Sequence, residues 1–225
     1  MKLVLLGASG MVGVGVLREA LAAPEVETVL SIGRSPCGVA HPKLRELVLP
    51  DLLDIAAVED RLVGYDGCVW AVGIGSVGLD EAAYARITEE LTLLWAGTLL
   101  RLNPGFSFAY CSAAGAGGRW MWARVRQRVE AALRAMPFRH AGAVRPGLIR
   151  PGPGITSRVR AYRAGLVVMR PLFPLAEALF PSQVTSSGKL GRAMLSVVEG
   201  RADRFILEAA DINRIGVSSG MAIES

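Results

Sequence analysis

Residues 2–13 read Lys2-Leu3-Val4-Leu5-Leu6-Gly7-Ala8-Ser9-Gly10-Met11-Val12-Gly13. Residues 2–6 form a short, mainly apolar run that is followed by a glycine, and such a run is typical of a buried strand. Residues 10–22 continue with the pattern of a helix. The three glycines stand where the strand turns into the helix. Gly7 would allow a tight turn, Gly10 would let a phosphate group approach the backbone, and Gly13 would let the helix pack on the strand.

This turn predicts an anion site, because the first N–H groups of a helix have no partner within the helix. We expect the pyrophosphate of a dinucleotide to lie against Gly7, Ala8, Ser9, Gly10, Met11 and Val12. A tight strand-to-helix turn without a ligand is the alternative interpretation.

Strand and helix patterns alternate over the first ~145 residues. Further strands are predicted at 29–32, 47–49, 68–72, 106–111 and 138–144, and further helices at 80–102 and 119–136. This alternation predicts an α/β fold with a doubly wound parallel sheet. We expect one domain over 1–225, in which the proline-rich part of the chain, 146–185, forms a small C-terminal cap on the substrate side.

Composition excludes several classes of protein. The three cysteines, Cys37, Cys68 and Cys111, lie far apart and only two histidines occur, so we expect no disulfide framework and no metal site. The net charge is +5, but the arginines are dispersed, which favours a phosphorylated small molecule over nucleic acid as partner. No signal peptide or membrane-spanning run is recognisable, so we expect a cytoplasmic protein.

The segments that follow the next strands indicate which dinucleotide binds. Arg34 stands where an acidic residue would hold a ribose 2′-hydroxyl, and a guanidinium there suits a 2′-phosphate, so we expect NADP rather than NAD. Asp51 is placed to accept the adenine amino group, or else to stabilise a helix start. The small residues Ala71, Val72 and Gly73 would let the adenosine ribose lie close, unless they form a plain loop.

Together these motifs resemble the short-chain dehydrogenase/reductase superfamily, in its atypical branch related to NAD(P)-dependent epimerases/dehydratases. The resemblance is carried by Gly-x-x-Gly-x-x-Gly at 7–13, Gly33-Arg34, Ala71-Val72-Gly73, Tyr110-Cys111-Ser112-Ala113 and Arg145-Pro146-Gly147. It implies a Rossmann fold, a nicotinamide cofactor, a contact of Pro146 and Gly147 with that cofactor, and a late helix around Gly191-Arg192-Ala193-Met194.

The resemblance also implies catalytic residues, and here the chain departs from the family. Ser112 matches the serine that polarises a substrate carbonyl. The Tyr-x-x-x-Lys pair of the next helix is replaced by Trp122 and Arg126, within a Met-Trp-Ala-Arg-Val segment similar to a bacterial subgroup. An indole cannot serve as general acid, but Arg126 can still hold the nicotinamide ribose. Trp122 is then either a core or cofactor-wall residue or a partner stacked on Arg126.

Three tyrosines are alternative proton donors: Tyr110, Tyr84 and Tyr162. We expect an NADP-binding oxidoreductase or epimerase-like protein that acts on a carbonyl or alcohol substrate. A non-catalytic NADP(H)-binding regulatory module is the alternative, because the usual Tyr-Lys pair is missing. The basic and then apolar residues 158–175 fit a packed cap, a substrate lid, a homodimer contact or a membrane-surface helix.

Overall fold

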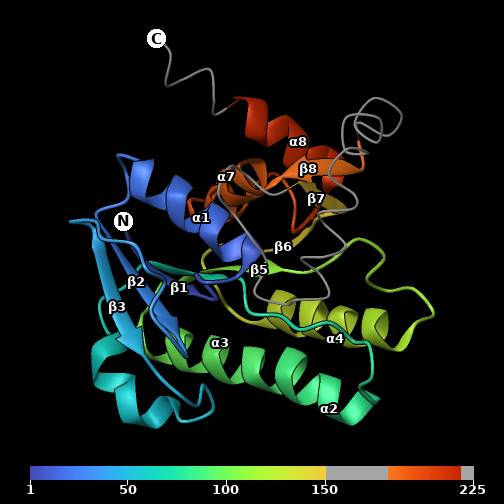
Figure 1. The fold of residues 1–225 in the computed structure, drawn as a ribbon, viewed down its shortest axis with the longest axis horizontal. Coiled ribbons are helices and arrows are strands. Elements are labelled where there is room, and N and C mark those ends of the chain that lie inside the picture. Colours follow the sequence, from blue (N-terminus) through green and yellow to red (C-terminus); the bar gives the residue numbers. More distant parts are fainter. Residues whose placement is uncertain (151–181, 219–225) are drawn as a thin grey trace.

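A computed structural model describes residues 1–150 and 182–218 of the chain. Its centre is a sheet of seven parallel strands (Figure 1). In spatial order the strands are β3 (Leu44–Val48), β2 (Thr28–Gly33), β1 (Lys2–Leu6), β4 (Gly67–Trp70), β5 (Ser107–Cys111), β6 (Ala141–Arg145) and β9 (Ile206–Glu208). The chain therefore has the predicted α/β, doubly wound, Rossmann-like fold, in which the strand order reverses between β1 and β4.

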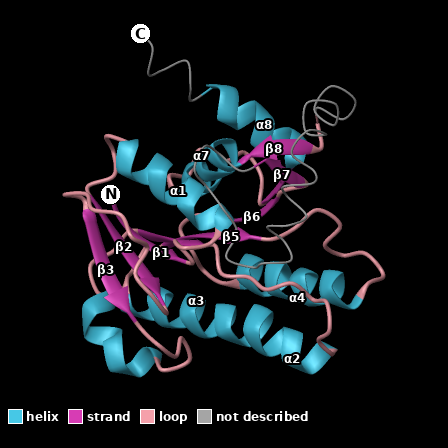
Figure 2. Cartoon of the chain, viewed as in Figure 1, coloured by secondary structure: helices cyan, strands magenta, loops and turns pink. Residues whose placement is uncertain are grey.

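Helices cover both faces of the sheet (Figure 2). One layer holds α1 (Met11–Ala22), α7 (Ser187–Val198) and α8 (Ala209–Ser218), and the other holds α2 (Glu81–Ala85), α3 (Leu91–Leu102) and α4 (Met121–Ala135). A hydrophobic core lies on each face of the sheet. Alternate residues of β1 pack into these two cores, because successive side chains of a strand point to opposite faces. Leu3 and Leu5 pack in the first core, and Val4 and Leu6 pack in the second.

The helix predicted over 80–102 is present, but it is not a uniform α-helix. It begins at α2, where the Asp80 side chain accepts from the N–H of Ala83 at 2.8 Å, and a π-helical segment, η2 (Arg86–Glu90), joins α2 to α3. A π-helical turn holds more residues than an α-helical one and changes which side chains face inward. Arg128 of α4 pairs with Glu81 and Glu89, which ties α2 and η2 to α4.

Short elements escaped the sequence interpretation because three or four residues show no periodicity. They include the strands β7 (Leu148–Arg150) and β8 (Val184–Ser186), which pair in parallel in a separate small sheet. The longer 3₁₀ segment η1 (Ile55–Leu62) follows Asp51, where the alternative interpretation of that residue expected a helix start. The late helix implied by Gly191-Arg192-Ala193-Met194 is α7.

The predicted cap is only partly within the described residues. Strands β7 and β8 lie in its first and last parts, whereas Tyr162 and the whole basic and apolar stretch 158–175 belong to the undescribed residues 151–181. The cap and the single-domain assignment therefore stay predictions. Among the described residues, no helix has the length and apolar character that crossing a membrane requires.

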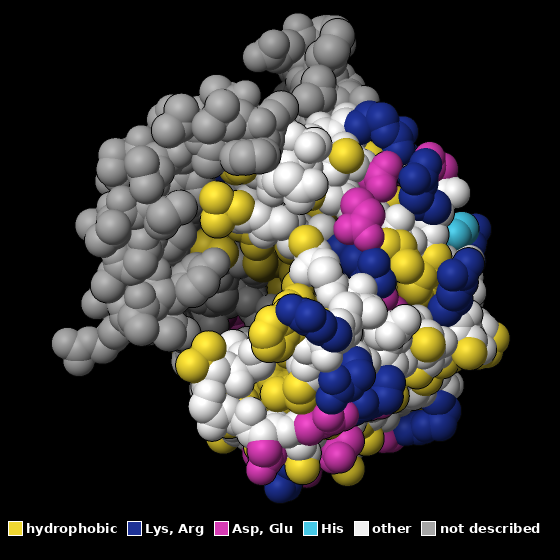
Figure 3. Space-filling model, turned by 90° about the vertical axis from the view of Figure 1, so that its right-hand side faces the viewer, with side chains coloured by type: hydrophobic (Ala, Val, Ile, Leu, Met, Phe, Trp, Pro, Cys, Tyr) yellow, Lys and Arg dark blue, Asp and Glu magenta, His cyan; other side chains and the backbone are white. Residues whose placement is uncertain are grey.

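Charged side chains of both signs lie close together on the described surface. On the face in Figure 3, Lys and Arg side chains stand beside Asp and Glu side chains in several places. Ion pairs at the surface of the described residues include Arg101–Glu59 and Arg124–Glu81. The positive charge of this face is thus interrupted by carboxylates, unlike the continuous basic stripe that favours nucleic acid.

Candidate functional site

The glycine turn at the end of β1 has a geometry that only glycine fits at two positions. Gly7 has a φ of +86°, and a Cβ atom there would stand 2.6 Å from the carbonyl oxygen of Ala71. A Cβ atom on Gly13 would stand 2.0 Å from the carbonyl oxygen of Gly7. Gly7 and Gly13 therefore let β1, α1 and the segment after β4 come into backbone contact.

Gly10 is different, because the backbone around it is open. It is exposed, and a Cβ atom on it would meet only the Gly7 carbonyl oxygen, at 3.3 Å. Gly10 is the N-cap of α1 and no side chain caps the helix, so the first N–H groups of the helix remain for an external acceptor. Ala8 is buried, while Ser9, Met11 and Val12 are half-buried around this opening. The turn has the shape that the sequence predicts for a pyrophosphate site.

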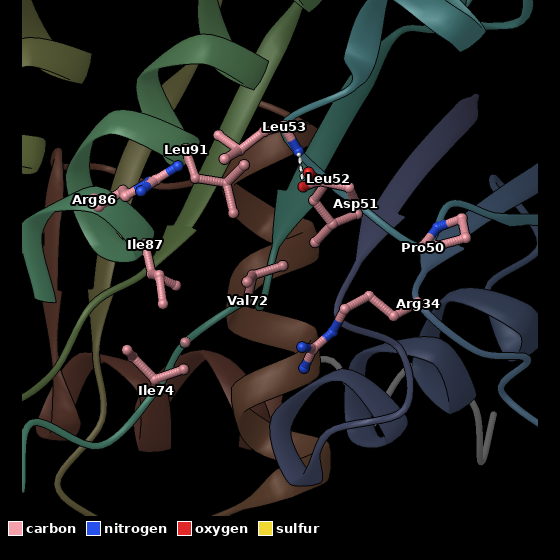
Figure 4. A pocket seen from close by; sticks show the side chains of 11 residues that line it. Arg34, Pro50, Asp51, Leu52, Leu53, Val72, Ile74, Arg86, Ile87 and Leu91 are labelled. Atoms are coloured by element: carbon pink, nitrogen blue, oxygen red, sulfur yellow. Dashed lines mark hydrogen bonds between the residues drawn. The ribbon is translucent and has the colours of Figure 1, made fainter. Parts of the chain in front are cut away.

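A pocket of about 260 Å³ lies beyond the carboxyl ends of β2, β3 and β4 (Figure 4). Four residues predicted to bind the cofactor line it: Arg34, Asp51, Val72 and Gly73. Sequence interpretation missed its other lining residues, which are Pro50, Leu52, Leu53, Ile74, Arg86, Ile87 and Leu91. Arg86, Ile87 and Leu91 come from η2 and the start of α3, and no local pattern relates them to the glycine turn.

The polar residues of this pocket stand on different sides. In Figure 4, Arg34 reaches toward the middle of the pocket from the end of β2, and Arg86 lies on the opposite side. The Asp51 carboxylate accepts from the N–H of Leu53 at 2.9 Å, so it stabilises the turn before η1, whose N-cap is Asp54. That contact occupies Oδ1 of Asp51, and the contact of Asp51 with adenine remains a prediction.

Arg126 of α4 reaches the carboxyl ends of β4 and β5. Its Nε donates to the Tyr84 hydroxyl at 3.0 Å, its Nη1 donates to the Cys111 carbonyl at 3.2 Å, and its Nη2 lies 3.7 Å from where a Cβ on Gly73 would stand. Burial lowers the pKa of Arg126, but nearby Tyr110, Tyr84 and Cys111 raise the pKa by more, so the group stays charged. The structure thus brings Tyr84 and Arg126 together although 42 residues separate them in the chain.

Two aromatic residues that the sequence singled out have different surroundings. The hydroxyl of Tyr110 is buried with no hydrogen-bond partner among the described residues, and burial strongly raises its pKa, so it is a poor proton donor. The ring of Trp122 lies against Gly115, 3.4 Å from where a Cβ would stand. The cation–π contacts of the described residues are Arg119 on Trp120 and Arg134 on Phe205, so the considered stack of Trp122 on Arg126 is not formed.

Ser112, after β5, is buried in a polar network. Its Oγ lies 2.6 Å from Oε1 of Glu130, and Arg145 donates to both oxygens of the same carboxylate. A carboxylate paired with arginine is acceptor-only, so the Ser112 hydroxyl is the donor. This contact competes with the predicted contact to a substrate oxygen, and the catalytic role of Ser112 stays a prediction.

Pro146 and Gly147, the remaining predicted cofactor residues, hold the backbone near this network. The Pro146 carbonyl accepts from the N–H of Ala114 at 3.0 Å, and a Cβ on Gly147 would stand 2.4 Å from the Gln183 carbonyl oxygen. Their contact with a cofactor stays a prediction. Within residues 1–150 and 182–218, no cluster of His, Cys, Asp and Glu has the make-up of a metal site.

Comparisons with known proteins bear on the fold. No family model matches the chain, and no curated protein matches it. Solved structures do match, at low identity. An oxidoreductase of the short-chain dehydrogenase/reductase family from Burkholderia thailandensis is 16% identical with a TM-score of 0.71, over 100% of this chain and 98% of that one.

Two further matches are proteins solved with ligands. UDP-N-acetylglucosamine 4-epimerase from Methanobrevibacter ruminantium M1, in complex with UDP-N-acetylmuramic acid, is 15% identical with a TM-score of 0.68 over 100% of this chain and 82% of that one. MoeE5, in complex with UDP-glucose and NAD, is 17% identical with a TM-score of 0.66 over 92% of this chain and 74% of that one. This chain therefore shares the Rossmann-like fold of short-chain dehydrogenase/reductase and epimerase structures.

Proposed function

We propose that the chain is an NADP-binding oxidoreductase or epimerase-like protein that acts on a carbonyl or alcohol substrate. One observation carries the proposal: at the point where the strand order reverses, the glycine turn opens α1 without a side-chain cap, and the pocket that holds Arg34 lies beside it. Open α/β sheets bind dinucleotides at this point. The three similar structures belong to proteins whose names describe an oxidoreductase, an epimerase and an NAD complex.

In this proposal, each group of cofactor-binding residues contacts a different part of the dinucleotide. The N–H groups of the turn from Gly7 to Val12 would hold the pyrophosphate. Arg34 would pair with the 2′-phosphate in a bidentate contact, and Asp51 would accept from the adenine amino group. The backbone of residues 71–73 would lie beside the adenosine ribose. Residues 146–147 would contact the opposite end of the cofactor. A bound nicotinamide would supply the hydride-transfer chemistry.

The residues at the reacting end are Arg126, Ser112 and Tyr84. Arg126 would donate to the nicotinamide ribose and keep its charge throughout. Ser112 would donate a hydrogen bond to the substrate oxygen if its hydroxyl group turned away from Glu130. Of the two candidate tyrosines among the described residues, Tyr84 is the one that accepts a hydrogen bond from Arg126, and because its hydroxyl accepts there, its own proton remains available. Tyr84 is 1% exposed, so substrate would have to reach it through the site.

A second function is favoured by a specific observation. The Ser112 hydroxyl is engaged by Glu130, and α4 has Trp122 where the family has its tyrosine. A protein that binds NADP(H) without turnover and reports its level to a partner would need neither group. Such a module would keep the glycine turn and the Arg34 pocket unchanged.

Isothermal titration calorimetry with NADPH, NADP⁺ and NADH tests the proposal. We expect saturable binding of NADPH, with weaker binding of NADH, and heat from none of the three would refute it. The oxidation of NADPH across a panel of aldehydes, ketones and sugar nucleotides then separates the two functions. Turnover with at least one member supports the enzyme, and binding without turnover across the panel supports the regulatory module.

A further inference from the structure

Arg126 differs from the other half-buried arginines of the described residues. Three arginines have this intermediate burial: Arg126, Arg145 and Arg192. Arg145 pairs with Glu130 and Glu208, and Arg192 pairs with Glu19 at 2.9 Å. Arg126 has no carboxylate within 4.0 Å among the described residues, and its hydrogen-bond partners there are the neutral Tyr84 hydroxyl and Cys111 carbonyl.

A charge removed from water without a counterion is costly, so proteins pair buried charges with opposite ones. The carboxylates nearest along the adjoining helices are already engaged. Glu130, one turn after Arg126 on α4, binds Arg145 and Ser112, and Glu81 of α2 binds Arg124 and Arg128. Within residues 1–150 and 182–218, Arg126 is therefore a guanidinium without a counterion at the carboxyl edge of the sheet.

The position of this guanidinium points toward the ligand rather than toward the core. Its Nη2 lies beside Gly73, which also lines the 260 Å³ pocket, and its Nη1 binds the carbonyl of the last residue of β5. Ligands of open α/β sheets bind beyond these strand ends. The contacts to Tyr84 and Cys111 use two of the five N–H groups of the guanidinium, which leaves donors for a planar anion.

We propose that the N–H groups of Arg126 that its contacts with Tyr84, Cys111 and the nicotinamide ribose leave over bind an anionic group, a carboxylate or a phosphate, of the substrate, so that Arg126 determines the substrate class. This inference rests on the proposed function in one respect, which is that the anionic ligand is the substrate. Tyr84 is a positioning residue in this arrangement, because its hydroxyl accepts from Nε and fixes the plane of the guanidinium. A neutral substrate of the same shape would leave the buried charge uncompensated and would bind more weakly.

The test follows the Arg126 side chain directly. Inorganic phosphate and acetate are titrated at constant ionic strength into the full chain, with and without saturating NADP⁺, while the arginine Nε–H resonances are observed by NMR. Arg126→Gln identifies the resonance, and Arg124→Gln, on the exposed side of the same helix, is the matched control. We expect a saturable shift of the Arg126 resonance in both cofactor states, with chloride about tenfold weaker or more.

The outcomes separate this inference from the proposed function. The absence of a saturable shift at Arg126 with both anions overturns the inference, whatever NADPH does. A shift that NADP⁺ abolishes by competition also overturns it, because the anion would then belong to the cofactor. A saturable shift in a chain that does not bind NADPH supports the anion site and refutes the NADP assignment alone.

A second control addresses the longer of the two undescribed segments of the chain. Residues 151–181 contain one acidic residue, Glu177. Glu177→Gln should leave the phosphate titration at Arg126 unchanged. Binding that appears only in this variant would show that Glu177 is the counterion of Arg126 and would overturn the proposal.

Discussion

The hydroxyl of Ser112 donates to Glu130 across 2.6 Å, and Arg145 holds both oxygens of the same carboxylate. Glu130 is 4% exposed, and Arg145 also pairs with Glu208, the last residue of β9. The network joins the end of β5 to α4, β6 and β9. It therefore fixes the strand ends that surround the candidate site.

Glu130→Gln should lower the free energy of unfolding by about 3 kcal/mol, because it breaks a buried ion pair and leaves Arg145 with the half-exposed Glu208. Ser112→Ala should cost about 1 kcal/mol, since it removes one hydrogen bond from a carboxylate that keeps its arginine. Urea unfolding of both variants and of the double variant measures the coupling. Equal, small losses for both single variants would contradict the assigned network.

The parts of the fold that follow from local pattern were predictable from sequence. The glycine turn identified β1 and α1, and the alternation of apolar strands with amphipathic helices led to the parallel sheet. Residues 2–6 were placed within the observed strand because a short apolar run ending in glycine has few other solutions.

The contacts that shape the site were not predictable in the same way. Tyr84 and Arg126 meet because α2 and α4 pack together, and neither residue carries a local signal for the other. The Glu130 partner of Ser112 was missed for the same reason, because a single glutamate in an amphipathic helix resembles any solvent-facing one. Its burial depends on Arg145, which comes from a different strand.

Gly10→Ala and Gly13→Ala should separate binding from folding. A methyl group on Gly13 would overlap the Gly7 carbonyl oxygen, so Gly13→Ala should destabilise the fold by about 2 kcal/mol or more. Gly10 has an ordinary negative φ and open surroundings, so Gly10→Ala should change stability by only a few tenths of a kcal/mol while weakening NADPH about tenfold or more. Thermal unfolding and calorimetry check both, and wild-type NADPH affinity in Gly10→Ala would remove the pyrophosphate from this turn.

Arg34→Glu should weaken NADPH about tenfold or more and NADH much less, because the reversed charge would repel the 2′-phosphate that only NADPH carries. Arg45→Glu is the matched control, since Arg45 is equally exposed on neighbouring β3 and does not line the pocket. Calorimetric titration of both variants with both cofactors provides the comparison. Equal losses for NADPH and NADH would refute the role of Arg34 in cofactor choice.

Glu199, at the end of α7, should make the stability of the fold depend on pH. Burial raises its pKa to about 7 from an ordinary value of 4.5; its partner Arg201 opposes this shift and nearby Glu25 adds to it. Between those two pH values the folded chain holds a proton that the unfolded chain has lost. The free energy of unfolding should therefore fall as pH rises through this window, by about 1 to 2 kcal/mol after allowance for solvent screening, and then level off.

Glu199→Gln removes this titration, so the variant should lose most of the fall in stability between about pH 5 and about pH 8. Urea unfolding at several pH values measures how steeply the free energy of unfolding falls with pH. Glu27→Gln, at an exposed position in the N-terminal half of the chain, is the control for a general change in net charge. An unchanged slope in Glu199→Gln would mean that the pH dependence arises elsewhere. A slope that vanishes in both variants would point to net charge rather than to the buried carboxyl group of Glu199, because Glu27 is exposed.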